Sequence, residues 1–186
     1  MRIISGYLKG KKLALPKDKN TRPLRDMVKE SIFNVIEHSQ LINCKIKNSK
    51  VLDLFSGTGS FGLECISRGA KKVVFCENHL NAQKILENNI SNLNCHNTTQ
   101  VIGADIFVSL ESGKFQEDAF EIIFLDPPYK EEKIHTLLLS IKKNKILKKN
   151  GLIILHRHKK EKDLLPDEVK ILNERTYGLS KIIFAS

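Results

Sequence analysis

Short apolar runs alternate with helix-length segments along most of the chain, and this alternation is the strongest constraint on its fold. Five runs suit strands that are buried on both faces: Val51–Phe55, Lys72–Cys76, Thr98–Ile102, Phe120–Leu125 and Gly151–His156. The segments between them suit helices that end near Arg68, Leu93 and Asn144. Strands that alternate with helices form βαβ units and a parallel sheet.

Two more apolar runs close the chain, at Val169–Arg175 and Leu179–Ala185. The connection between them, around Tyr177 and Gly178, is too short for a crossover helix, so we expect this pair to be antiparallel. The sequence therefore predicts an α/β, Rossmann-like fold. Its mostly parallel seven-stranded sheet would carry helices on both faces and an antiparallel C-terminal strand pair.

The first fifty residues carry most of the excess positive charge. They hold twelve Lys/Arg and four Asp/Glu, a balance of +8, whereas residues 51–186 hold nineteen and seventeen, a balance of +2. Arg2–Leu15 predicts a small hairpin of two strands around Gly6 and Gly10, and Pro23–His38 predicts a helix. A basic segment favours a polyanionic partner, although a solvated surface has the same composition. The residues alone leave both possibilities open, and we predict a basic extension over residues 1–40 that precedes a second domain over residues 41–186.

Several classes of protein do not fit the composition. No apolar run approaches the roughly 20 residues of a membrane-spanning helix, and the N-terminus lacks the apolar core of a signal peptide. We therefore expect a cytoplasmic protein that does not contact a membrane. The six histidines show no metal-ligand spacing, and no two cysteines are close in sequence. We therefore expect no metal site and four reduced thiols: Cys44, Cys65, Cys76 and Cys95.

A glycine-rich turn follows the first buried strand and opens a helix. Gly57, Gly59 and Gly62 let the backbone turn tightly and approach a ligand closely. Glu77, at the end of the next strand, can accept hydrogen bonds from a ribose diol. The glycine spacing also satisfies the dinucleotide fingerprint, so an NAD-dependent oxidoreductase has to be weighed. Asp53 lies just before the turn, where a carboxylate suits the cations of S-adenosylmethionine and repels a pyrophosphate, which favours S-adenosylmethionine.

Two further positions follow strands on the same predicted sheet edge. Asp105, after the third strand, could bond an adenine amino group, or it could be a helix N-cap, because Ile106 and Phe107 begin an apolar stretch. Asn78, directly after Glu77, is a candidate cofactor contact or the start of a helix. The residues alone leave these alternatives open.

The sequence Asp126-Pro127-Pro128-Tyr129 directly follows the strongest strand, Phe120–Leu125. The exocyclic amine of a base is a poor nucleophile because its lone pair is delocalised into the ring. The Asp126 carboxylate and the Pro127 carbonyl could accept its N–H groups, and two prolines preorganise that carbonyl. Tyr129 offers a ring on which a base could stack. The motif therefore favours methylation of an amino group over a merely rigid turn.

These motifs together resemble the class I, Rossmann-like methyltransferases of amino nitrogens. Other motifs narrow the resemblance to the RsmD family: Met1–Gly6, Gly10–Leu13, Arg22-Pro23, Asp26, Lys29-Glu30, Phe33-Asn34, Gly62–Glu64, Ser67–Ala70 and Arg175-x-Tyr177-Gly178. The chain departs from the family at Leu24, where a threonine is usual, and mildly at Ser56 and Thr58 in the turn.

The resemblance implies methylation of guanine N2 in 16S rRNA, with partly assembled small ribosomal subunits as the preferred partner and a monomeric enzyme. Asp126, Pro127, Pro128 and Tyr129 would form the catalytic loop. The predicted S-adenosylmethionine contacts are Asp53, Phe55, Gly57, Thr58, Gly59, Glu77, Asn78, Asp105, Ile106 and Arg22, although Arg22 could equally bind an RNA phosphate. The predicted RNA contacts are Lys9, Lys11, Lys12, Lys17, Arg25 and Lys29.

Other functions remain open on the sequence. A DNA adenine-N6 or cytosine-N4 methyltransferase can share the Asp126–Tyr129 motif, but 186 residues leave little room for a target-recognition domain. A glutamine methyltransferase favours asparagine in place of Asp126. A non-catalytic RNA-binding assembly factor could also keep the fold.

Overall fold

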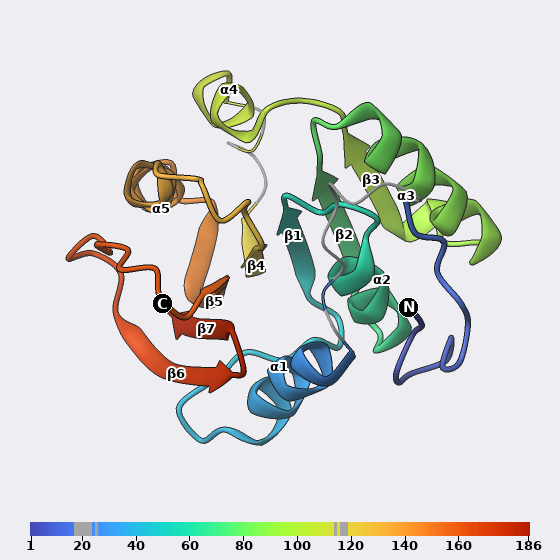
Figure 1. Ribbon diagram of the computed structural model, residues 1–186, viewed down its shortest axis with the longest axis horizontal. Helices are drawn as coiled ribbons and strands as arrows, with labels where there is room; N and C mark the ends of the chain where they lie inside the picture. The colour runs from blue at the N-terminus through green and yellow to red at the C-terminus, as the bar shows by residue number, and fades with distance from the viewer. Residues whose placement is uncertain (17–23, 25, 114, 116–118) are drawn as a thin grey trace.

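Figure 1 shows a computed structural model of the protein, which describes residues 1–16, 24, 26–113, 115 and 119–186. A seven-stranded sheet runs through its centre in the order β3-β2-β1-β4-β5-β7-β6. The strands are β1 (Lys50–Leu54), β2 (Lys72–Cys76), β3 (Thr99–Ile102), β4 (Phe120–Leu125), β5 (Leu147–His158), β6 (Ile171–Tyr177) and β7 (Ser180–Ala185). The strands β1 to β5 are parallel, and β7 pairs antiparallel with both β5 and β6. The predicted sheet and its antiparallel C-terminal pair are confirmed.

Helices connect the parallel strands. The described helices are α1 (Asp26–His38), α2 (Ser60–Ser67), α3 (Leu80–Asn92), α4 (Ile106–Glu111) and α5 (Ile134–Lys143), with a 3₁₀ turn at His96–Thr98. The sequence analysis did not predict α4 as an element, although Asp105 was weighed as its N-cap. The start of the predicted first helix, at Pro23, lies outside the described residues.

Successive residues of the central strands pack into two separate cores, because strand side chains alternate between the two faces of a sheet. On β1, Val51 joins a cluster with α1, α2, α3 and the N-terminal segment. The next residue, Leu52, joins a cluster with α4 and α5 on the opposite face. The three-layer arrangement can be followed in Figure 1. Helices therefore cover both faces, as predicted.

The strand β5 is longer than the sequence predicted. Its first residue, Leu147, pairs with Phe120 of β4, and a bulge then shifts the register so that Leu152 pairs with Ile122. The prediction began this strand at Gly151 because three polar residues, at 148–150, interrupt the apolar pattern. The bulge accommodates that interruption, since it leaves extra residues unpaired.

The N-terminal segment was predicted as a small hairpin of two strands, and its two arms do pair, but over a shorter stretch than predicted: Ile3 N donates to Lys11 O at 2.9 Å and Leu13 N to Met1 O at 3.0 Å. Arg2 and Lys12 form a single isolated bridge, and the rest of the segment turns back on itself through Gly6 (φ +81°) and Gly10 (φ +84°). The paired stretch is short because the backbone N–H groups that follow Ile3 bond α2 instead. Ile4 N and Ser5 N donate to the Glu64 carboxylate at 2.7 and 2.9 Å.

Close packing holds this segment against the domain. A Cβ atom on Gly6 would lie 1.8 Å from the carbonyl oxygen of Ser67, so only glycine fits there. The buried Asn89 of α3 joins two segments: its amide accepts from Ala14 N at 2.8 Å and donates to the Thr58 carbonyl at 3.0 Å. The segment is thereby tied to the glycine-rich turn.

Candidate active site

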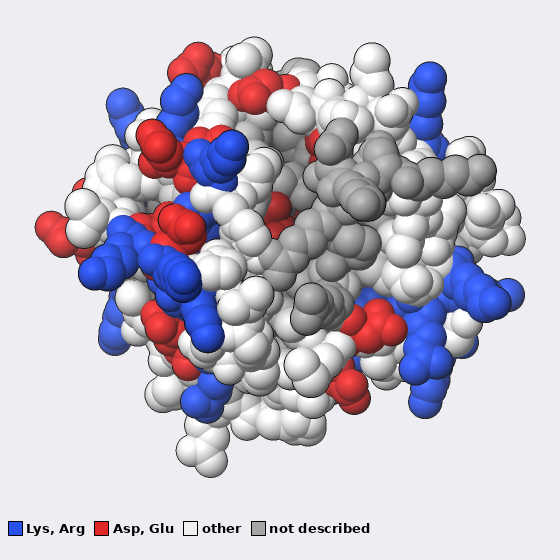
Figure 2. Space-filling view, viewed as in Figure 1, with Lys and Arg blue, Asp and Glu red and all other residues white. Residues whose placement is uncertain are grey.

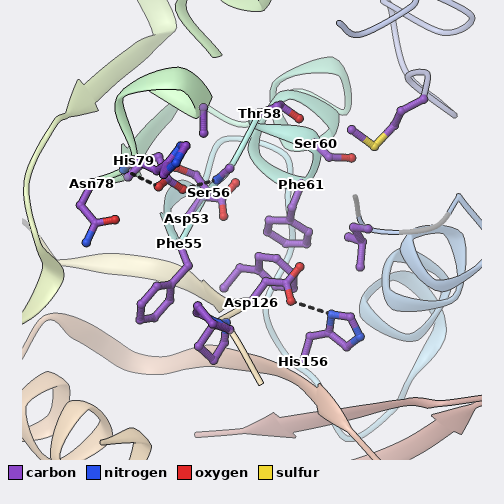
Figure 3. Close-up of a pocket in the computed structure, with 18 of the residues that line it drawn as sticks. Asp53, Phe55, Ser56, Thr58, Ser60, Phe61, Asn78, His79, Asp126 and His156 are labelled. Carbon is purple, nitrogen blue, oxygen red and sulfur yellow. Dashed lines mark hydrogen bonds and ion pairs between the residues drawn. The ribbon is translucent and has the colours of Figure 1, made fainter. Parts of the chain in front are cut away.

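A cavity of about 450 Å³ opens at the carboxyl ends of β1, β2, β4 and β5 (Figure 3). Ligands of open α/β sheets bind at this edge. The predicted catalytic loop and most of the predicted cofactor contacts meet there. The cavity is lined by Met1, Leu24, Asp53, Phe55, Ser56, Gly57, Thr58, Ser60, Phe61, Glu77, Asn78, His79, Ala82, Phe124, Asp126, Pro127, Pro128, Tyr129, His156 and Ser180.

The glycine-rich turn between β1 and α2 has a strained, closely packed backbone. Gly57 and Gly59 have φ angles of +54° and +83°, a region that side chains disfavour. A Cβ atom on Gly59 would also lie 2.4 Å from a methyl group of Leu86. Phe55 adopts φ +59° although it is not a glycine, and its ring lines the cavity. Backbone strain of this kind is often found at ligand sites.

Asp53, at the floor of the cavity, is only 1% exposed. One of its oxygens, Oδ2, accepts the Gly62 N–H at 2.9 Å, and no described residue bonds the other oxygen, Oδ1. Burial raises the pKa of this carboxyl well above its usual value, and the charges of Asp126 and Glu77 raise it further. A cation bound in the cavity would offset this cost and stabilise the ionised form.

Glu77 lies after β2 with both oxygens turned to backbone N–H groups. Oε2 accepts from Gly57 at 2.7 Å and Oε1 from His79 at 2.8 Å. These bonds fix the carboxylate across the mouth of the glycine-rich turn. A carboxylate has lone pairs beyond those two bonds, so Glu77 can also accept ribose hydroxyls.

Asp105 serves as the N-cap of α4, the alternative weighed for it. Its Oδ1 accepts from Phe107 N at 2.9 Å, and Asn78 donates to its Oδ2 at 3.4 Å. Asn78 lines the cavity, but neither Asp105 nor the buried Ile106 does among the described residues. Contacts of Asp105 and Ile106 with a cofactor therefore stay predictions. Arg22 lies outside the described residues.

The catalytic loop predicted after β4 reaches the same cavity. The Asp126 side chain is about one quarter exposed, and its Oδ1 lies 2.8 Å from Nδ1 of His156 at the end of β5. Pro127 is buried and Pro128 is exposed. The Tyr129 ring lines the cavity and meets the His158 ring edge to face, with 5.1 Å between their centroids.

The buried Arg157 bonds the backbone of this loop. This role was not predicted from the sequence. Its side chain is only 2% exposed. It donates to the carbonyls of Pro128 at 3.1 Å and Glu131 at 3.0 Å, and it forms an ion pair with Asp163 at 2.9 Å. An arginine inside the apolar run of β5 was the available signal, since a buried charge needs partners.

Lys29 was predicted to contact RNA, and the structure contradicts this. Its side chain is fully buried, and Nζ donates to the Arg2 carbonyl at 2.8 Å and lies 3.6 Å from Glu64. Burial lowers the pKa of Lys29, while Glu64 acts in the opposite direction. Lys29 also donates to Ser60 Oγ at 3.3 Å, and Ser60 lines the cavity. Lys29 therefore stabilises the wall of the cavity and does not bind a phosphate.

The other predicted RNA contacts divide into two groups. Lys9, Lys11 and Lys12 are exposed on the N-terminal segment. In Figure 2, basic side chains project on the right, where Figure 1 places that segment beside α3. Lys17 and Arg25 lie outside the described residues. Met1 and Leu24 line the cavity, which sequence reasoning did not anticipate.

Comparison with known proteins identifies the family. The family described as conserved hypothetical protein 95 matches residues 1–186. The chain belongs to this family. It is 36% identical to the putative rRNA methyltransferase YlbH of Bacillus subtilis, over 98% of this chain and 96% of that protein. It is 33% identical to the ribosomal RNA small subunit methyltransferase D of Haemophilus influenzae, over 96% and 90%.

Solved structures agree with this membership. A crystal structure of a putative methylase from Haemophilus influenzae matches with a TM-score of 0.75 and 30% identity, covering 99% of this chain and 96% of that one. The resemblance to the RsmD family is therefore confirmed, and so is the class I methyltransferase fold. The residue assignments rest on the geometry described above.

Proposed function

We propose that this protein transfers the methyl group of S-adenosylmethionine to the N2 amine of a guanine in 16S rRNA. The methyltransferase family and the named rRNA methyltransferases among its relatives support the reaction class. We further propose that it acts as a cytoplasmic monomer and that its substrate is the small ribosomal subunit. One observation carries the chemistry: Asp126 of an Asp-Pro-Pro-Tyr loop and the acid Asp53 face one cavity from neighbouring strands.

The residues of the cavity fit S-adenosylmethionine. The buried Oδ1 of Asp53 has no bond from a described residue, and a positively charged ligand would supply one. Gly57 lines the cavity at φ +54°, so its backbone can approach a bound ligand closely. Glu77 would hold the ribose hydroxyls and Phe55 would contact the ligand with its ring. When bound, the cofactor supplies an electrophilic methyl group on a sulfonium.

The catalytic loop would act on the amine of the base. Oδ2 of Asp126, which no described residue bonds, would accept an N–H of the amine, which restores lone-pair density to N2 and directs it at the methyl carbon. As the new C–N bond forms and the methyl–sulfur bond breaks, N2 must lose a proton, and Asp126 is placed to accept it. Most of the rate enhancement would come from holding the two reactants in line.

The target base has to leave its stack to reach this depth. Tyr129 lines the cavity beside the His158 ring, and we assign its ring as the surface on which the extruded base stacks. Exposed Lys9, Lys11 and Lys12 would neutralise phosphates outside the cavity. These assignments account for why amine chemistry and a basic surface occur in one small chain.

The decisive test is transfer of labelled methyl groups to small ribosomal subunits that lack their own guanine-N2 methylation, followed by nucleoside analysis. We expect labelled N2-methylguanosine in the 16S rRNA. Transfer to unmethylated DNA instead would favour the adenine-N6 or cytosine-N4 alternative. Cofactor binding without transfer to any nucleic acid would favour a non-catalytic assembly factor.

A further inference from the structure

A buried histidine lies directly behind the catalytic loop. His156, near the end of β5, is 4% exposed, yet it reaches the cavity wall between Asp126 and β7 (Figure 3). Its Nδ1 lies 2.8 Å from Asp126 Oδ1, and its Nε2 lies 2.9 Å from Ser180 Oγ. Both ring nitrogens therefore have a side-chain partner: Asp126, directly after β4, and Ser180, at the start of β7.

The partners determine where the ring proton sits. An ionised carboxylate can only accept hydrogen bonds, so the nitrogen facing Asp126 carries the proton. In a neutral imidazole the other nitrogen is then an acceptor, and the Ser180 hydroxyl donates to it. Ser180 is itself buried, which keeps this bond out of competition with water. The chain thus selects one tautomer of His156.

The bond to His156 fixes the part of Asp126 that the backbone leaves free. The backbone of the loop is already held, because Asp126 N donates to Leu54 O at 3.4 Å and Arg157 binds the Pro128 carbonyl. These contacts do not set the rotation of the carboxylate. A hydrogen bond to Oδ1 does set it, and among the described residues it leaves Oδ2 open to the cavity.

We propose that His156, whose ring is anchored at Nε2 by Ser180, is a positioning residue that aims Asp126 Oδ2 at the exocyclic amine. This inference rests on the proposed function of the site. His156 does not touch the base; it acts only through Asp126. Its loss would slow the chemical step without changing cofactor binding, because misplacement of a reacting group by about 1 Å can cost on the order of 100-fold in rate.

Two amide variants separate positioning from structural support. His156→Asn places an amide N–H near the position of Nδ1, where it can still bond Asp126. His156→Gln places its amide near the position of Nε2, toward Ser180, and leaves Asp126 Oδ1 without its donor. We expect His156→Asn to keep kcat within a few-fold of the wild type and His156→Gln to lower it about 10- to 100-fold, with KM for the cofactor unchanged in both.

Matched measurements make the outcome readable. His135→Asn, in an exposed histidine of α5 whose Nδ1 meets a backbone carbonyl at 3.2 Å, is the control and should behave as the wild type. Thermal unfolding and calorimetric cofactor binding would be measured for every variant. Equal kcat for the Asn and Gln variants, or losses of kcat that only follow losses of stability, would overturn the positioning role. If the wild type itself transfers no methyl group to the subunit, the proposed function fails instead.

Discussion

The two acids of the cavity are held in opposite ways. Asp53, near the end of β1, bonds a backbone N–H nine residues further along the chain. Asp126, after β4, bonds the side chain of a residue thirty positions away on the neighbouring strand. The cofactor half of the site is thus built from local backbone, and the substrate half from side chains that only the folded sheet brings together.

This difference indicates what each half can tolerate. The cofactor half depends on glycines and on a buried acid, so changes there should alter cofactor affinity and stability. A side-chain network orients one reactive group, so changes there should alter turnover while the cofactor still binds. The first three substitutions below each change one half of the site, and the last changes the basic segment outside both halves.

Asp126→Ala is expected to have the largest effect, on turnover alone. It removes the acceptor for the amine, and loss of one such electrostatic contact lowers kcat on the order of 100- to 1,000-fold. Calorimetry should show unchanged cofactor binding, because Asp126 belongs to the substrate half. Loss of binding together with turnover would mean that the two halves are not separable.

Asp53→Asn is expected to act on cofactor binding and on stability instead of on turnover. It removes a charged partner of the cofactor, and such a hydrogen bond is worth about 1.5–3 kcal/mol, so affinity should fall roughly 10- to 100-fold. Stability should rise, because the raised pKa of Asp53 shows that the folded chain disfavours its ionised form.

The pH dependence gives this variant a second readout. A carboxyl with a raised folded pKa contributes stability below its unfolded pKa, and this stability is lost as pH rises through the folded pKa. Without cofactor, the melting temperature of Asp53→Asn should therefore exceed that of the wild type by a margin that grows as pH rises through that range. Parallel melting curves at all pH values would contradict the assignment.

Arg157→Lys should give a smaller loss, again in the substrate half. Lysine keeps the charge beside Asp163 but lacks the planar fork that reaches the carbonyls of Pro128 and Glu131. We expect kcat to fall about tenfold, since the loop loses part of its preorganisation, with no change in cofactor affinity. Single-turnover rates on the subunit would measure this; an unchanged rate would show that the prolines alone hold the loop.

Reversing the charges of Lys11 and Lys12 should have the smallest effect and leave both halves intact. If each lysine neutralises one phosphate, the salt dependence of RNA binding should flatten by about 1.5 in slope. Filter binding of the subunit RNA at several salt concentrations would measure it. Control reversal of Lys142 and Lys143, on α5 across the sheet, should leave the slope unchanged.

Much of the fold could be predicted from the sequence because its signals are local. The strands β2 and β4 begin and end where the apolar runs predicted, and the antiparallel end followed from a short connection. The N-terminal strands could not be predicted correctly. Arg2 and Lys12 do pair, but the N–H groups of Ile4 and Ser5 bond the distant Glu64, which only the tertiary structure reveals.

The residues of the site also separate into those with a local sequence signal and those without one. Asp53, the glycines and Glu77 are recognisable because motif and structure coincide within one βαβ unit. Lys29 was assigned wrongly because a lysine in a basic segment is expected at the surface. Its buried partner, Glu64, is far away in the sequence and is visible only in the structure. The roles of His156 and Arg157 depend on pairing between β4 and β5, which no local pattern records.

Glu64 receives more than one kind of donor at once: two backbone N–H groups, Arg68 Nε at 2.9 Å and, at a longer distance, Lys29. No single substitution at this position satisfies all of them, and loss of Glu64 would strand a buried ammonium. In evolutionary terms, the residues at positions 29, 64 and 68 should therefore be inherited as one unit. We expect related chains to keep the three residues together or to exchange them together, even where the surrounding helices drift.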